Sequence, residues 1–189
     1  AYALFLGLVG SEMCIRDRDS DGTHVNDSND ILHYIDESHG NKFPREGEDA
    51  EQDKWMKFSN DILGKSIVAV IYKNYRTSLH ALDYVTKVDK FSLKDRIVSK
   101  WLGAIVMGMI GRSRAKMFDE PPRTNLQTQL DSMSSGIEGE FFGGKGPNGA
   151  DFANYGILRS MQGLNGFDIV EKHNVIWPWY NRMQVLSNI

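Results

Sequence analysis

From residue 48 onward, apolar residues recur along the chain at spacings of three and four, the period of a helix with one buried face. The first such stretch predicts a helix from about Glu48 to Lys73, in which Gly64 marks a kink or a break. The residues expected on its buried side are Trp55, Phe58, Ile62, Ile67, Val70 and Ile71.

Two further helices are expected next. Thr77 can cap a helix that extends to Val88, and its apolar stripe consists of Leu79, Leu82 and Val85. Ser92 and Asp95 then form an S-x-x-D capping pattern in front of the long apolar run IVSKWLGAIVMGMI.

This apolar run predicts a buried core helix rather than a membrane span. Its uncharged part, residues 101–111, is much shorter than the roughly 20 residues that cross a bilayer. Its glycines, Gly103, Gly108 and Gly111, suggest close contact with other helices. Trp101 and the run Met107–Met109, like Trp55, are interpreted as core residues and not as a cofactor site.

The remaining helices follow at short intervals. The Asp-Glu-Pro-Pro segment at 119–122 ends the apolar helix, because proline cannot continue it. Thr124 can cap the next helix, which has Leu126, Leu130, Met133 and Ile137 on one face. A short helix at 167–173 and a terminal helix with Pro178 in its first turn complete the pattern.

The segment 139–164 carries the most specific local signals. Residues 139–145 fit G-x-x-x-x-G-K, but a phosphate-binding loop needs a Ser or Thr after the lysine, and Gly146 stands there. We therefore interpret the glycines as a turn between helices. Asn148 can then cap a helix whose Asp151 reaches back to the Asn148 amide, and apolar groups around that helix predict a buried position in the domain.

The first 49 residues have a different character. We interpret residues 1–18 (AYALFLGLVG followed by SEMCIRDR) as a non-native, sequencing-adaptor-like stretch that includes Cys14. Residues 19–39 read as a turn, a short strand and a helix, and residues 40–54 as a polar linker and helix start. The helical domain is expected to span 48–189.

Composition excludes several classes of function. The chain of 189 residues has a net charge of −3, which argues against a nucleic-acid-binding surface. Its one cysteine excludes an internal disulfide framework and a multi-cysteine zinc site. The five histidines show no metal-ligand spacing, so no metal site is expected.

Taken together, the turn and the capped helix resemble the C-terminal domain of glutathione transferases. The run GG-x-x-P-x-x-A-D-x-A-x-Y-G-x-L-R-x-M-x-G-L is more closely similar to the membrane-associated prostaglandin E synthase type 2 family of that superfamily. Tyr75-Arg76-Thr77, Pro178-Trp179-Tyr180 and Asn26-Asp27-Ser28 are further matches. The resemblance covers about residues 24–189 and implies a mainly α fold, an all-helical glutathione-transferase C-terminal domain with 19–39 as a strand-and-helix remnant of a thioredoxin-like α/β domain.

The resemblance also implies a glutathione site. Asp27 and Ser28 match the acidic residue and the serine that hold the γ-glutamyl end of glutathione in the superfamily. From the residues alone, the same pair is a helix cap, and the two roles are compatible. Arg159 is a candidate cation for the interdomain cleft, with a structural ion pair as the alternative. The catalytic residues are unknown, because the C-x-x-C motif of the family is absent.

The function that the resemblance implies for the intact protein is glutathione-dependent isomerisation of an endoperoxide to a keto-alcohol. The present chain is expected to be an N-terminally truncated fragment without that activity. The alternatives are a general glutathione transferase or oxidoreductase, and a non-catalytic binding or dimerisation module. The family can also hold haem, but no residue here matches a haem ligand.

Expectations about partners also come from the resemblance. They are a small-molecule substrate of lipid-derived type, no nucleic acid, a homodimer as in many transferases, and membrane association only through an N-terminal segment that the chain lacks. Localisation is left open between the cytoplasm and the Golgi or mitochondrial membranes.

Overall fold

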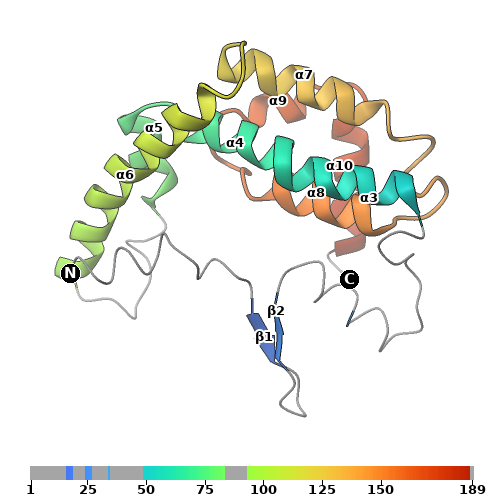
Figure 1. Ribbon diagram of the computed structural model, residues 1–189, viewed down its shortest axis with the longest axis horizontal. Coiled ribbons are helices and arrows are strands. Elements are labelled where there is room, and N and C mark those ends of the chain that lie inside the picture. Colours follow the sequence, from blue (N-terminus) through green and yellow to red (C-terminus); the bar gives the residue numbers. More distant parts are fainter. Residues whose placement is uncertain (1–15, 19–23, 27–33, 35–48, 84–92, 188–189) are drawn as a thin grey trace. The chain divides into compact units, whose positions relative to one another are not determined.

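The computed structural model describes residues 16–18, 24–26, 34, 49–83 and 93–187. The chain divides into two units, Ala1–Asp49 and Ala50–Ile189. In the described part of the first unit, strands β1 (Arg16–Arg18) and β2 (His24–Asn26) pair antiparallel, with Asp17 opposite Val25 (Figure 1). The thioredoxin-like remnant at 19–39 stays a prediction, since most of that segment lies outside the described residues.

The second unit begins with one continuous helical rod that contains a π-helical turn. Helix α3 (Ala50–Phe58) passes into the π-helix η1 (Ser59–Leu63) and then into α4 (Gly64–Ile71). A π-turn holds more residues than an α-turn, so it shifts the phase of every later side chain. The prediction that Ile62 is buried is therefore wrong, since Ile62 is 38% exposed and Leu63 is fully buried instead.

Three residues separate the end of α4 from the start of helix α5 (Tyr75–Ala81). Its N-cap is Asn74, whose side chain accepts from the Thr77 amide, while the Thr77 hydroxyl accepts from the Asn74 amide. The prediction of Thr77 as the cap is corrected: Thr77 is the reciprocal partner in this capping box. The predicted continuation toward Val88 lies outside the described residues from 84 onward.

Helix α6 (Leu93–Ala115) packs against α4 and α5, as Figure 1 shows. The predicted close approach at its glycines is confirmed. A Cβ atom on Gly103 would lie 3.1 Å from Leu82, and one on Gly111 would collide with the backbone of Tyr72. The proposed cap at Ser92 lies outside the described residues.

The prediction that α6 is buried is wrong for one of its faces. Trp101 is 54% exposed and Met109 is 55% exposed, so neither belongs to the core, whereas Trp55 does. The glycines of α6 lie at its contacts with α4 and α5, and large apolar side chains next to them are exposed. No helix in the described part of the chain is long and apolar enough to cross a membrane.

Helix α7 (Pro122–Ser134) follows the Pro-Pro segment and buries Leu126, Leu130 and Met133, as predicted. Its N-cap position is Pro121, which makes no side-chain cap, so the prediction of Thr124 as the cap is wrong. Proline already has the backbone angle of a first helical turn and has no amide hydrogen to satisfy. The helix therefore starts three residues earlier than expected.

Three helices complete the unit: α8 (Gly149–Arg159), α9 (Phe167–Glu171) and α10 (Ile176–Ser187). The buried ring of His173 caps α10, since its Nδ1 accepts from the amides of Val175 and Ile176, at 3.3 and 3.2 Å, while its Nε2 faces Asp131 at 3.1 Å. Nothing in the sequence pattern had indicated this cap.

The core lies where α3, η1 and α4 pack against α7 and α8, with α9 and α10 closing the far side (Figure 1). The largest fully buried side chains include Trp179, Tyr180, Leu63 and Leu126. The prediction of a mainly α fold is confirmed, and the described helices are consistent with an all-helical transferase-type domain.

Replacing Gly111 by alanine tests the contact between α6 and α4. The new methyl group would collide with backbone atoms of Tyr72, which cannot rotate away. We expect the variant to lose about 1–3 kcal/mol of unfolding free energy in urea denaturation. The matched control is Gly156→Ala, where no atom lies within 4 Å of the added Cβ and stability should rise by about 0.5–1 kcal/mol. Equal effects of the two changes would contradict the packing.

A second prediction concerns the acid sensitivity of the α7–α9 contact. The hydrogen bond from Arg123, at 2.5 Å, holds the pKa of Asp168 below its ordinary value of 3.8. The pair therefore stabilises the fold above about pH 4 and loses its effect as the pH falls through the lowered pKa. Because both side chains are 42% exposed, we expect only about 0.5 kcal/mol. Denaturation of the wild type and of Asp168→Asn at pH 3 and pH 7 should show a larger difference at pH 7 than at pH 3.

Candidate functional site

The capping box at the start of α8 is present as predicted. The Asn148 side-chain oxygen accepts from the amides of Ala150 and Asp151 at 3.0 and 3.3 Å. In return, the Asp151 carboxylate accepts from the Asn148 amide at 2.9 Å. The amide of Gly149 donates to Gln52 Oε1 at 2.9 Å. All three leading amides of α8 are thus bound by side chains, as a buried helix start requires.

The glycine-rich segment before α8 forms a tight turn, and two of its amides bind the Asp151 carboxylate. Phe141 and Gly144 exchange backbone hydrogen bonds, and Gly144 has a φ of 78°, a conformation that glycine adopts readily. The amides of Phe142 and Gly143 donate to Asp151 at 3.0 and 3.4 Å. The turn connects two helices, so the interpretation as a turn is confirmed over that of a phosphate-binding loop.

Asp151 also reaches the last helix. The indole nitrogen of Trp179 donates to Asp151 Oδ1 at 2.7 Å, and both side chains are fully buried. The carboxylate therefore accepts four hydrogen bonds, from the turn, from the cap and from α10. A carboxylate has about four acceptor positions, so none is left for a ligand. We assign Asp151 a structural role.

Sequence reasoning missed two residues that fix α8 against α3. Gln52, on α3, accepts from the Gly149 amide, as described above. Asn154 donates to the carbonyl oxygens of Trp55 and Ala150 at 3.1 and 2.8 Å. Both residues are polar and buried on the otherwise apolar side of a helix. A polar residue at such a position is the signal in the sequence that could have identified them.

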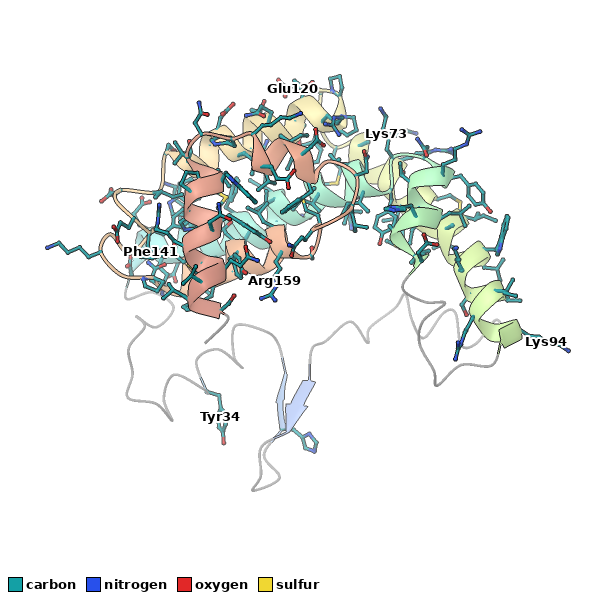
Figure 2. The ribbon with its side chains drawn as sticks, turned by 180° about the vertical axis from the view of Figure 1, so that it is seen from behind. Tyr34, Lys73, Lys94, Glu120, Phe141 and Arg159 are labelled. Carbon is teal, nitrogen blue, oxygen red and sulfur yellow. The ribbon has the colours of Figure 1, made fainter. Side chains whose placement is uncertain are left out.

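Arg159, the candidate cleft cation, lies on the surface at the end of α8 (Figure 2). Its guanidinium group is 5.8 Å from the centre of the Tyr155 ring and donates to the Ser187 hydroxyl at 3.4 Å. The described contacts of Arg159 include no carboxylate. The cation is thus held on α8 beside the end of α10 and is accessible to solvent.

A group of aromatic rings lies beneath this arginine. Tyr155 is 5.1 Å from the ring of Tyr180, which stacks on Trp177 at 5.6 Å. The hydroxyl of Tyr180 is buried, and the described residues give it no hydrogen-bond partner. Burial raises the pKa of Tyr180, and the neighbouring Tyr155 adds to that effect. The phenol is therefore held in its neutral form.

The proposed glutathione contacts cannot be placed in space. Asp27 and Ser28 lie outside the described residues, as does Cys14. Among the described residues, no group of three or more His, Cys, Asp or Glu side chains could hold a metal ion. The geometry therefore defines the supporting scaffold around Asp151 and one accessible cation, Arg159.

No family model matches the chain. Curated proteins similar to it include two that are named prostaglandin E synthase 2. The protein of Mus musculus is 33% identical over 139 residues, which cover 71% of this chain and 36% of the relative. The protein of Danio rerio is 31% identical over 147 residues, which cover 75% and 39% of the two sequences. The chain thus spans less than half the length of these relatives.

The role of Asp151 can be tested by an isosteric change. In Asp151→Asn, an NH2 group replaces one of the two carboxylate oxygens. Its N–H bonds would face N–H groups that donate hydrogen bonds to the carboxylate in the wild type. We expect a loss of about 2–4 kcal/mol in unfolding free energy, since buried hydrogen bonds to a charged group are lost and donors are left unpaired. Asp61→Asn is the control, because Asp61 is 71% exposed and should change stability by less than about 0.5 kcal/mol. A fully stable Asp151→Asn variant would refute the structural role.

Proposed function

Because the chain belongs to the prostaglandin E synthase 2-like family, we propose that it is part of a protein that isomerises an endoperoxide to a keto-alcohol with glutathione as cofactor. The observation that carries this proposal is the identity of 31–33% to two relatives of that name, over about three quarters of the chain. The buried capping network at Asp151 accounts for the residues by which the chain resembles the family, and it supports the shared fold rather than the reaction.

In this proposal, glutathione binds at the segment that contains Asp27 and Ser28. The Asp27 carboxylate would pair with the ammonium group of the γ-glutamyl end, and the Ser28 hydroxyl would donate to its carboxylate. A helix beginning at this point would add backbone amides at its positive end. The γ-glutamyl end is a zwitterion with an ammonium group and a carboxylate. Binding both groups requires an anion and a hydrogen-bond donor, which an acidic residue and a neighbouring serine provide.

The helical unit would supply a rigid surface for the substrate. Its turn, α8 and α10 are joined through Asp151, so the surface above them cannot change shape freely. Arg159 would offer this surface a positive charge for a carboxylate group on the substrate. A lipid-derived acid with an endoperoxide has such a group, so we assign Arg159 to substrate orientation and not to bond breaking.

The thiol step of the proposed reaction has no residue assigned to it in this sequence. The chain contains one cysteine, Cys14, and no C-x-x-C motif. A second candidate function, glutathione binding without catalysis, is favoured by this observation. The two functions share the binding site and differ in turnover.

Glutathione binding is measured by the thermal stability of the full chain. A ligand that binds only the folded state stabilises it by about 2.7 kcal/mol at one hundred times its dissociation constant. We expect the melting temperature to rise with glutathione, and the rise to be lost in Asp27→Ala. Asp30→Ala is the matched control, an acidic residue three positions away that should keep the shift. Absence of a shift in the wild type would refute the proposed binding.

Turnover separates the two candidates. Conversion of an endoperoxide substrate to the keto-alcohol by the intact protein of which the chain is part, dependent on glutathione and reduced by Arg159→Ala, would support the isomerase. A glutathione-induced shift without conversion would support the binding module.

A further inference from the structure

Helix α8 contains one glycine that the described part of the chain does not need for its own packing. Gly156 lies in the second half of the helix and is exposed, and no described atom lies within 4 Å of a Cβ atom built on it. Its φ is not positive, so the backbone does not require glycine either. A glycine inside a helix costs about 0.5–1 kcal/mol relative to alanine. Gly156 therefore weakens α8 without a visible structural benefit.

Gly149, the first residue of the same helix, shows what a packing glycine looks like. A Cβ atom there would lie 3.1 Å from the Met56 sulfur and 3.2 Å from Gln52 Oε1, in the buried contact between α8 and α3. At Gly156, the space that a side chain would occupy is open instead. Glycine is the residue that allows a ligand to approach the backbone closely. The open position therefore indicates a place where a ligand can lie directly on α8.

A cation borders this open position. Arg159 follows Gly156 by three residues, so the two lie on the same face of the helix. Helical side chains lean toward the N-terminus, and the Arg159 guanidinium group accordingly lies 5.8 Å from the centre of the Tyr155 ring. In its described contacts, this group donates through Nη1 to Ser187 and meets no carboxylate. A guanidinium group has five N–H donors, so several remain for a ligand.

Phe152 lies on the same face, four residues before Gly156, and is 37% exposed. Phe152, Gly156 and Arg159 thus follow one another along α8 as an apolar ring, an open position and a cation. With a rise of 1.5 Å per residue, these three positions span about 10 Å. That length matches a medium-chain aliphatic acid, such as octanoate, in its extended form.

The cation decides which kind of ligand fits. An uncharged occupant would remove part of the guanidinium group from water and leave the charge without a partner, which is unfavourable. A carboxylate would compensate the charge, and its two oxygens match the parallel N–H groups of arginine. The complementary ligand therefore has an anionic end at Arg159 and an apolar chain that extends toward Phe152.

We propose that Phe152, Gly156 and Arg159 form a binding strip for an aliphatic carboxylate, whose chain lies across the open position at Gly156. Arg159 orients the carboxylate, and Gly156 determines specificity, because any side chain at position 156 would occupy the path of the hydrocarbon chain. The inference rests on the proposed function in one respect: it specifies where on α8 an acidic, lipid-derived substrate would lie.

The test is binding of octanoate to the isotope-labelled full chain, followed through the backbone amide resonances in nuclear magnetic resonance. Octanamide has the same chain without the charge and is the matched ligand. We expect octanoate to shift the resonances of residues 152–159 and to bind at least about threefold more tightly than octanamide, as for a partly exposed ion pair. No shift at these residues, or equal affinity for the two ligands, would overturn the proposal.

Substitutions then assign the ligand to the strip. Gly156→Gln should weaken octanoate binding at least about fivefold, because the new side chain fills the space of the ligand. Gly146→Gln is the control, since Gly146 is also exposed with no described atom within 4 Å of an added Cβ, but lies in the turn before α8. Arg159→Gln should lower the affinity for octanoate to that for octanamide, and Arg112→Gln, on α6, should not. Unchanged binding in Gly156→Gln or in Arg159→Gln would contradict the strip.

The stability and the molar mass of Gly156→Gln distinguish a ligand site from a protein contact. Glutamine favours the helix more than glycine does, so this variant should melt at the same temperature as the wild type or above it. A lower melting temperature would show that another segment of the chain covers the position. A molar mass that falls on substitution would show a contact between copies. Either result would overturn the proposal.

Octanoate binding requires neither glutathione nor turnover, so the strip and the proposed reaction fail separately. Conversion of an endoperoxide by the intact protein, together with no octanoate binding on α8, would overturn the strip and leave the proposed function intact. Octanoate binding at residues 152–159 without any conversion would support the strip and count against the isomerase.

Discussion

The buried carboxylate of Asp151 holds together three parts of the helical unit that are distant in sequence. Its oxygens accept from the turn before α8, from the first residue of the cap and from the indole of Trp179 on α10. A buried anion without such donors would be very unfavourable, so the turn, the cap and α10 must form together. Gly143 and Gly144 let the chain fold back closely enough to bring two amides to the same group, because Gly144 has a positive φ and a Cβ atom on Gly143 would collide with the Gly146 carbonyl oxygen.

In this arrangement, the residue that stabilises the fold is a different one from the residue proposed to contact a ligand. Asp151 has its acceptor positions filled by the protein, which makes it a fixed part of the scaffold. Arg159, on the same helix but eight residues later, is exposed and contacts Tyr155 and Ser187 within the described part of the chain, so it can meet a ligand. The turn and α8, the stretch that most closely resembles the family, are thus explained by what the fold requires. The proposed glutathione contacts belong to a different segment.

The apolar residues of helix α6 form two surfaces, one that packs against other helices and one that is exposed. Its small residues allow the backbone to approach Tyr72 and Leu82, and its large residues face outward. A helix that is apolar on both sides is usually buried, which is why the sequence favoured a core position.

The sequence by itself determined the helical class, the cap of α8, the turn before it and the family, because these depend on local spacing and on backbone requirements of single residues. It failed where an effect depended on neighbours distant in the chain. The π-turn at Ser59–Leu63 moved Ile62 out of the core, and the exposure of Trp101 depended on which elements were available to cover α6. The bond between Asp151 and Trp179 joins residues 28 positions apart. Only the packing of α8 against α10 brings them together. The spacing of apolar residues predicts that a side chain is buried, but it does not identify the side chain that it contacts.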